Sequence, residues 1–231
     1  MRTYFLRHGE SLSNAAPYAL ALPEDEGDRL SERGEEQAEL AAERIEDLGI
    51  SRIVCSPLGR ARQTAIAVAK RTGFEPEIWD WTHELREPSD YARLTRGEQE
   101  RQRWSNRMSQ NDDPEFMPGD GESFADLLRR VERTRDRLVA DDVDHTLLVG
   151  HGIFCRFMFA LTLFGEEFGP RHAAWLWRIG SLNCGLSTFD HVVGSGSMDP
   201  ADISGWRCVT WMAPTVGREL ATGTGGVGPG A

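Results

Sequence analysis

The sequence contains only four cysteines and no hydrophobic run long enough to cross a membrane. The longest apolar stretch, around Phe157 to Phe164, is far shorter than the roughly 20 residues that a bilayer-spanning helix needs. The cysteines stand far apart and lack the spacing of metal ligands, so we expect reduced thiols. The start, Met1-Arg2-Thr3-Tyr4, leads straight into an expected strand and not into a signal peptide. These features favour a cytoplasmic protein with no membrane partner.

The chain also lacks an excess of positive charge. It has 37 acidic and 26 basic residues, which gives a formal net charge of -11. Broad nucleic-acid binding depends on a basic face, so we expect no nucleic-acid partner. A few converging arginines still make a local site for a phosphate group, whatever the net charge.

The order of apolar segments predicts the fold class. The chain reads as strand, helix, strand, helix, strand, a long polar stretch over residues 88–121, then helix, strand, helix and two late strands. This alternation predicts an α/β three-layer sandwich, with a mainly parallel central sheet and helices on both faces. A length of 231 residues suits a single domain, which we place at residues 1–213. The Gly-rich residues 214–231 are expected to form a flexible tail.

Two helices have clear starting residues. Ser31 suits the N-cap of a helix whose apolar positions recur at helical spacing, namely Ala38, Ala41, Ala42, Ile45 and Leu48. Ser123 similarly precedes Phe124, Leu127, Leu128, Val131 and Leu138. Each helix is therefore expected to bury one face and to expose the other.

Polar residues follow three of the expected strands. Tyr4-Phe5-Leu6 runs into Arg7-His8-Gly9, and Leu147-Leu148-Val149 runs into Gly150-His151-Gly152. Ile53-Val54-Cys55 runs into a loop and helix that begin Ser56-Pro57-Leu58-Gly59-Arg60. The carboxyl ends of parallel strands share one edge of the sheet, where α/β proteins bind their ligands. Two histidines and several arginines at that edge indicate an anionic substrate and a nucleophile or proton carrier.

Four ordered motifs carry a resemblance to a known family. They are Arg7-His8-Gly9-Glu10-Ser11 with Asn14, Ser56-Pro57-Leu58-Gly59-Arg60-Ala61 with Thr64, Leu85-Arg86-Glu87, and Val149-Gly150-His151-Gly152. In this order they resemble the histidine phosphatase superfamily, which includes cofactor-dependent phosphoglycerate mutases and many phosphomonoesterases. The resemblance spans roughly residues 1–190.

The resemblance implies a role for each matching residue. His8 is the expected nucleophile, which becomes transiently phosphorylated. Arg7, Arg60 and Asn14 are expected to bind the phosphoryl oxygens, and planar guanidinium groups suit that task. His151 is expected to stabilise charge on the same oxygens, either as imidazolium or as a neutral donor. Glu87 matches the proton donor to the leaving group.

Several alternatives stay open from the sequence alone. Glu84, three residues before Glu87, is an alternative acid. Arg62 is an alternative phosphate ligand, although a helix-surface arginine is the simpler interpretation. No His-Glu-x-x-His helix or cysteine pair accompanies His8 and His151, so we expect no metal and no other cofactor.

The sequence departs from the family after Glu87. Many relatives continue with an aromatic residue and glycine, whereas this chain reads Pro88-Ser89-Asp90-Tyr91-Ala92-Arg93-Leu94. The longer insert of glycolytic mutases, with paired arginines and a proline-rich run, is not recognisable between Glu98 and Gly121. In its place stand Arg101, Arg103, Trp104 and Arg107, which form either a substrate lid or an ordinary amphipathic helix.

These observations predict a phosphoric monoester hydrolase. Its partners would be a small phosphorylated metabolite as substrate and inorganic phosphate as product. A phosphoglycerate mutase using the same phosphohistidine chemistry is the first alternative, and the missing insert argues against it. A binder of phosphorylated ligands that has lost turnover is the second, and the retention of His8, Arg7, Arg60 and His151 argues against that.

Overall fold

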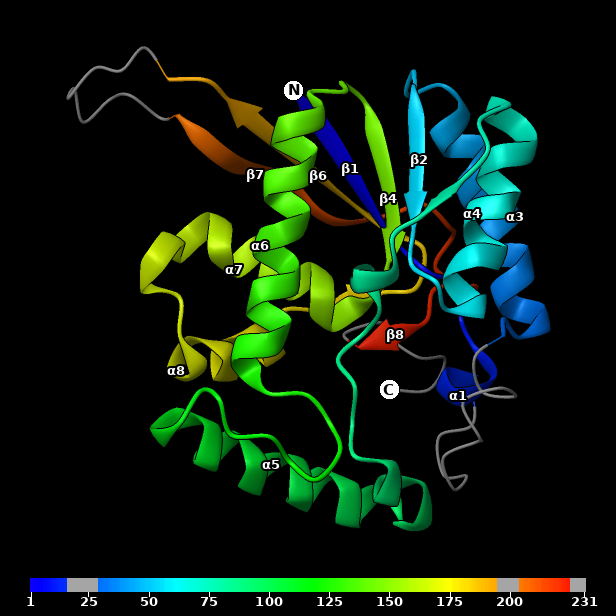
Figure 1. Cartoon of the computed structure of the whole chain (residues 1–231). Helices are drawn as coiled ribbons and strands as arrows, with labels where there is room; N and C mark the ends of the chain where they lie inside the picture. Colours follow the sequence, from blue (N-terminus) through cyan, green and yellow to red (C-terminus); the bar gives the residue numbers. More distant parts are fainter. Residues whose placement is uncertain (16–28, 195–203, 225–231) are drawn as a thin grey trace.

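A six-stranded mixed sheet forms the centre of the molecule (Figure 1). The structure is a computed structural model that describes residues 1–15, 29–194 and 204–224. The strands stand in the order β3-β2-β4-β1-β6-β7. They are β1 (Arg2–Arg7), β2 (Arg52–Cys55), β3 (Glu77–Ile78), β4 (Thr146–Gly150), β6 (Gly185–Val192) and β7 (Gly205–Pro214). The first four run parallel, and β6 and β7 add antiparallel strands at one side.

Helices cover both faces of this sheet, which confirms the predicted fold class (Figure 1). On one face, α3 (Glu32–Glu46) and α4 (Gly59–Thr72) pack small and branched residues against Leu6, Ile53 and Val149. On the other face, α6 (Phe124–Asp141) and α7 (Gly152–Phe164) pack against Phe5, Val54 and Leu148. Successive strand residues point to opposite faces, so the same strands supply both cores.

The predicted helix starts are confirmed. The Ser31 side chain accepts a hydrogen bond from the Gly34 amide at the start of α3. Ser123 and Asp126 form a reciprocal capping box at the start of α6. Both arrangements satisfy amide groups that the first helical turn leaves without partners.

The polar stretch over residues 88–121 contains a helix, one of the two forms left open for Arg101, Arg103, Trp104 and Arg107. After a short 3₁₀ turn, η2 (Ser89–Arg93), it forms the helix α5 (Arg96–Asp112). A capping box between Thr95 and Glu98 begins this helix. In Figure 1, α5 lies beyond the carboxyl ends of the parallel strands. It therefore stands on the side of the molecule where the sequence places the site.

The C-terminal segment joins the fold beyond the expected domain boundary at residue 213. The two-residue strands β5 (Ser181–Leu182) and β8 (Gly223–Thr224) pair antiparallel. Val216 is buried, and the Gln37 side chain donates hydrogen bonds to the Leu220 carbonyl and the Thr222 hydroxyl. The predicted boundary at residue 213 therefore lies too early in the chain, because residues up to 224 pack against the fold. Residues 225–231 lie outside the described residues.

The remaining elements are short. They are α1 (Leu12–Ala15), η1 (Asp80–Thr82), η3 (Gly165–Glu167), α8 (Pro170–Ala173) and η4 (Ala174–Arg178). Across the described ranges, no helix combines the length and apolar character needed to traverse a bilayer. All four cysteines are free; Cys55, Cys155 and Cys184 are buried, and Cys208 is half-buried.

Candidate active site

Strand register brings the two predicted site histidines together. Arg7 of β1 lies opposite Gly150 of β4, so His8 and His151 follow adjacent strand ends. The His8 amide continues the ladder with a 2.9 Å hydrogen bond to the Gly150 carbonyl. The imidazole centroids lie 5.2 Å apart. Both rings are almost completely buried, with 3% of His8 and none of His151 exposed.

The contacts of His8 define which ring nitrogen is free to react. Its Nδ1 lies 2.6 Å from the Gly9 carbonyl oxygen, which can only accept, so Nδ1 carries the proton. Arg60 Nε donates to His8 Nε2 across 3.2 Å, so Nε2 carries a lone pair. Burial, together with the charges of Arg60 and Arg7, holds the pKa of His8 well below the ordinary value of 6.5. The ring is therefore neutral near pH 7.

Arg7 and Arg60 reach the histidines from different strand ends. Arg7 is buried, and its Nη1 donates to the Ser181 carbonyl. Burial lowers the pKa of Arg7 to about 10, which leaves the guanidinium charged near neutrality. Arg60 sits in the first turn of α4 and is half-buried. Arg62, the alternative phosphate ligand, is exposed.

Asn14 is linked to His8 by Asn183, a residue that the sequence analysis did not assign to the site. The buried Asn183 side chain donates to the His8 carbonyl at 3.1 Å and to Asn14 Oδ1 at 3.2 Å. Asn14 itself is exposed, so its amide remains accessible to a ligand. Asn183 therefore ties the loop after β1 to the loop after β5.

Ser56 is a second residue whose position the sequence did not assign to the site. Its amide pairs with the Val149 carbonyl, which places it at the end of β2 beside β4. Its Oγ lies 2.7 Å from His151 Nε2 and accepts a longer, 3.3 Å hydrogen bond from the Leu58 amide. Ser56 opens the second sequence motif, but nothing local to it indicates a contact with a residue 95 positions away.

Unpaired polar atoms mark the same place. Among the described residues, only Thr3 Oγ1, Arg7 Nε and His151 Nδ1 are buried side-chain atoms without a hydrogen-bond partner. Two of the three belong to this group. An unpaired buried polar group costs about 1–3 kcal/mol, so the arrangement indicates a ligand that supplies the missing contacts.

The two candidate acids lie in different surroundings. The Glu84 carboxylate accepts hydrogen bonds from the amides of Leu85, Ile153 and Phe154, at 3.0, 2.9 and 3.1 Å. It therefore fastens the start of α7, directly after His151, and its oxygens are already engaged. The Glu87 carboxylate is a third exposed and forms a two-fold ion pair with Arg103 of α5, whose Nη2–Oε2 distance is 2.5 Å.

Glycines allow the close packing around the site. A side chain on Gly152 would lie 3.3 Å from Arg7 Nε and 2.9 Å from Ser181 Oγ. Gly9 approaches α3 closely: a Cβ there would lie 2.5 Å from the Gly34 carbonyl oxygen. Gly9 therefore lets the nucleophile loop pack on the start of a helix.

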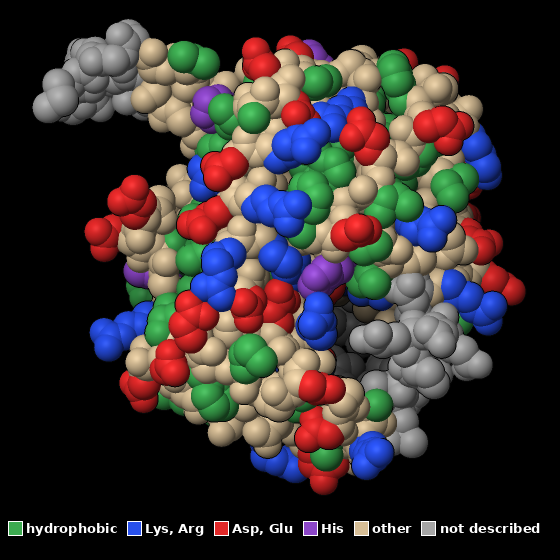
Figure 2. Space-filling model, in the orientation of Figure 1, with side chains coloured by type: hydrophobic (Ala, Val, Ile, Leu, Met, Phe, Trp, Pro, Cys, Tyr) green, Lys and Arg blue, Asp and Glu red, His purple; other side chains and the backbone are tan. Residues whose placement is uncertain are grey.

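The molecular surface is hollowed on the face shown in Figure 2. A histidine and basic side chains border the hollow in this view. Within the described ranges, no three His, Cys, Asp or Glu side chains are grouped so as to hold a metal ion. The charge that faces a ligand here comes from arginines.

Comparison with known proteins identifies the family. The model of the histidine phosphatase superfamily (branch 1) matches residues 3–198. The chain belongs to this superfamily. Two of its relatives are named probable phosphoglycerate mutase GpmB. The protein from Yersinia pestis is 31% identical over 211 residues, covering 89% of this chain and 90% of the relative. The protein from Erwinia tasmaniensis is 27% identical over 222 residues, with 94% and 93% covered.

Solved histidine phosphatase structures agree in fold. A mycobacterial glucosyl-3-phosphoglycerate phosphatase matches with a TM-score of 0.69 and 27% identity, over 92% of this chain and 98% of that one. The α-ribazole phosphatase from Shigella flexneri matches with a TM-score of 0.70 and 22% identity, over 94% and 98%, which supports the fold alone. Superfamily membership and the mycobacterial phosphatase support phosphatase- or mutase-type catalysis on a phosphorylated substrate.

Proposed function

We propose that this histidine phosphatase hydrolyses a small phosphate monoester through a phosphohistidine on His8. The observation that carries the proposal is the cluster of a neutral, buried imidazole, two arginines and the unpaired Arg7 Nε and His151 Nδ1. A phosphoryl group would supply acceptor oxygens to those donors. Its negative charge would also complement the two guanidinium groups.

In the first step, the lone pair on His8 Nε2 attacks phosphorus. A nitrogen–phosphorus bond forms as the ester's phosphorus–oxygen bond breaks, and the ring acquires positive charge. The 2.6 Å hydrogen bond from Nδ1 to the Gly9 carbonyl stabilises that charge. Arg60 Nε, which lies 3.2 Å from His8 Nε2, then donates to the incoming phosphoryl oxygens instead. Arg7 and Asn14 bind the same oxygens.

His151 acts as a neutral hydrogen-bond donor. The Ser56 oxygen already accepts from the Leu58 amide, so its hydroxyl proton is available for His151 Nε2. That places the imidazole proton on Nδ1, the atom without a partner. Burial and the nearby Arg60 hold the pKa of His151 well below 6.5, so the ring stays neutral. Of the two roles expected from the sequence, the surroundings favour the uncharged one.

Glu87 supplies the proton to the leaving oxygen. It later takes a proton from the water that attacks phosphohistidine, which releases phosphate and restores neutral His8. For the first step the ion pair with Arg103 must loosen and the carboxylate must take up a proton from solvent, because both of its oxygens accept hydrogen bonds from the guanidinium. Glu84 is unsuited to this task, because three backbone amides already use its oxygens.

A mutase is the second candidate, favoured by the relatives named phosphoglycerate mutase. It would share every step until water attacks, and would return the phosphoryl group to a hydroxyl of the substrate. Trapped phosphoenzyme distinguishes the two. A phosphatase loses its label to water as inorganic phosphate, whereas a mutase transfers it to phosphoglycerate.

The experiment that tests the proposal is turnover of para-nitrophenyl phosphate in the presence of a chelator. We expect release of phosphate, an acid-labile and base-stable phosphoenzyme, and loss of both in His8→Ala. Label on serine or cysteine, or undiminished turnover in His8→Ala, would refute the nucleophile. Activity that is abolished by the chelator and restored by zinc or magnesium would indicate metal catalysis instead.

A further inference from the structure

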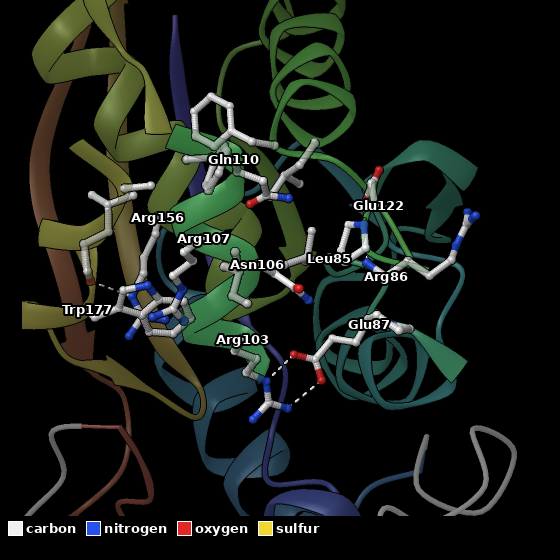
Figure 3. Close-up of a pocket in the computed structure, with 18 of the residues that line it drawn as sticks. Leu85, Arg86, Glu87, Arg103, Asn106, Arg107, Gln110, Glu122, Arg156 and Trp177 are labelled. Atoms are coloured by element: carbon white, nitrogen blue, oxygen red, sulfur yellow. Dashed lines mark hydrogen bonds and ion pairs between the residues drawn. The ribbon is translucent and has the colours of Figure 1, made fainter. Parts of the chain in front are cut away.

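A pocket beneath α5 lies next to the proposed phosphate-binding residues, and apart from Glu87 and its partner Arg103 its lining plays no part in the steps above (Figure 3). Its walls come from the loop that carries Glu87, from α5, and from the first turns of α6 and α7. The floor is apolar and includes Leu127, Phe157 and Leu176. Two cations of α5, Arg103 and Arg107, project toward this space in Figure 3.

The pocket borders the phosphate site along the start of α7. Ile153 and Arg156 line it, and they lie two and five residues after His151. The Arg156 guanidinium and Arg7 Nε both approach Gly152, at 3.5 and 3.3 Å from the position of a Cβ there. The proposed acid Glu87 lines the opposite wall. A group esterified to a phosphoryl on His8 therefore has this pocket as its neighbour.

Arg107 is a cation of the pocket that has no acidic partner within the described residues. Its guanidinium lies 4.2 Å from the centre of the Trp177 ring. It forms no ion pair with any residue in the described ranges, whereas Arg103 is paired with Glu87. The other acid of the pocket, Glu122, binds Arg130 with both oxygens, each at 2.6 Å. Burial and the charge of Arg103 lower the pKa of Arg107, so an incoming anion would relieve both costs.

We propose that this pocket binds the organic part of the substrate, and that Arg107 binds an acidic group on it. The inference rests on the proposed phosphatase function. The ligand class is a phosphate monoester with a hydrophobic body that carries a second anionic group. The apolar floor favours a hydrophobic body, because hydroxyl groups buried directly against it would lack hydrogen-bond partners there. The Arg107 guanidinium lies over the Trp177 ring and presents a planar pair of donors that suits a carboxylate.

Binding of stable phosphonates tests the subsite without relying on turnover. The probes are para- and meta-(phosphonomethyl)benzoate, their carboxamides, and phosphonopropionate, which has both anions but no ring. Calorimetry should show at least one benzoate isomer binding about tenfold or more tighter than its carboxamide, since a charge-assisted pair contributes about 1.4 kcal/mol or more. Phosphonopropionate should bind more weakly than that benzoate.

Variants on one helix locate the effect. Arg107→Gln should bring the benzoate-to-carboxamide ratio close to one, and Arg107→Lys should retain part of it. Arg101→Gln removes an exposed arginine of α5 that does not line the pocket, and should keep the wild-type ratio. Equal binding of each benzoate and its carboxamide to wild type would overturn the subsite. So would a ratio that persists in Arg107→Gln.

Failure of the proposed function would give a different result. It would appear as no phosphate release from para-nitrophenyl phosphate by wild type, while the phosphonate affinities remain measurable. A wild-type enzyme that turns over the aryl phosphate but ignores the carboxylate would retain the function and lose the subsite.

Discussion

At the residue scale, two buried histidines couple the site to the stability of the whole chain. The folded protein holds the pKa of both His8 and His151 well below 6.5 because of burial. As pH falls through about 6.5, the unfolded chain takes up these protons and the folded chain does not. The stability that the two rings provide is therefore complete above that pH and is lost progressively below it. For each ring, the free energy of unfolding should decrease by at most about 1.4 kcal/mol for every pH unit below 6.5.

Urea unfolding between about pH 5 and 8 measures this dependence. A double variant, His8→Asn with His151→Asn, is the comparison, because it removes both groups and leaves every other titrating residue. The wild-type slope below pH 6.5 should exceed that of the double variant. Parallel slopes would mean that the rings titrate normally in the folded state.

Arg60 is expected to act as a fork and not only as a positive charge. Its Nε donates to His8 Nε2, and in the proposed mechanism the guanidinium binds the phosphoryl oxygens. Lysine keeps the charge but has a single donor nitrogen, so Arg60→Lys should lower kcat/KM at least about tenfold. Arg62→Lys, two residues along α4 and exposed, is the matched control. Equal activity in the two variants would place Arg60 outside the reaction.

At the element scale, the loop before η2 carries two glutamates with separable roles. Glu87→Gln should slow alkyl phosphates far more than para-nitrophenyl phosphate, because a basic alkoxide needs protonation and a phenolate needs little. Glu84→Gln should slow both substrates by the same factor, because it loosens the start of α7 on which His151 depends. Single-turnover kinetics are the measurement, since Glu87 also assists the second step. A leaving-group effect in Glu84→Gln alone would reverse the two roles.

The sequence predicted the helices with strong periodicity and left open the one without it. Helices α3 and α6 have capping serines and apolar faces, and both were found. Helix α5 has no wholly buried apolar side, because it covers a pocket and exposes Trp104. Its one local signal is Thr95-Arg96-Gly97-Glu98, a capping-box pattern that marks the helix start.

The candidate site divides in the same way. His8, Arg7, Arg60 and His151 follow strand ends, so parallel pairing alone gathers them. Asn183 and Ser56 act through contacts between distant parts of the chain, and no pattern within either segment encodes them. The Glu87–Arg103 pair likewise depends on where α5 packs, which the sequence did not give.

At the scale of the whole molecule, the C-terminal segment closes against the first strand. Gly223 has φ of +112°, and a Cβ there would lie 2.9 Å from Arg7 Nη1 and 2.4 Å from the Ser181 carbonyl. Gly223→Ala should displace Arg7 and lower kcat/KM about tenfold or more, in addition to a backbone strain of about 1–3 kcal/mol. Kinetics and urea unfolding, measured together, separate the two effects.

Gly205 provides the control. It also has a positive φ, +92°, but no atom lies within 4 Å of its missing Cβ. Gly205→Ala should therefore lose stability and keep kcat/KM. If both variants lost activity equally, the contact with Arg7 would not be the cause.

The buried thiols have a consequence for oxidative stress. Burial raises the pKa of Cys55 and Cys208 to about 11 and that of Cys184 to about 12, and it holds the pKa of Cys155 well above its ordinary value. Peroxide and iodoacetamide attack thiolates, which these cysteines do not form near neutrality. The proposed nucleophile is an imidazole, so the native enzyme should keep its activity in millimolar peroxide and take up alkylating label only after unfolding. Such an enzyme would continue to release phosphate at peroxide concentrations that inactivate phosphatases with a catalytic cysteine.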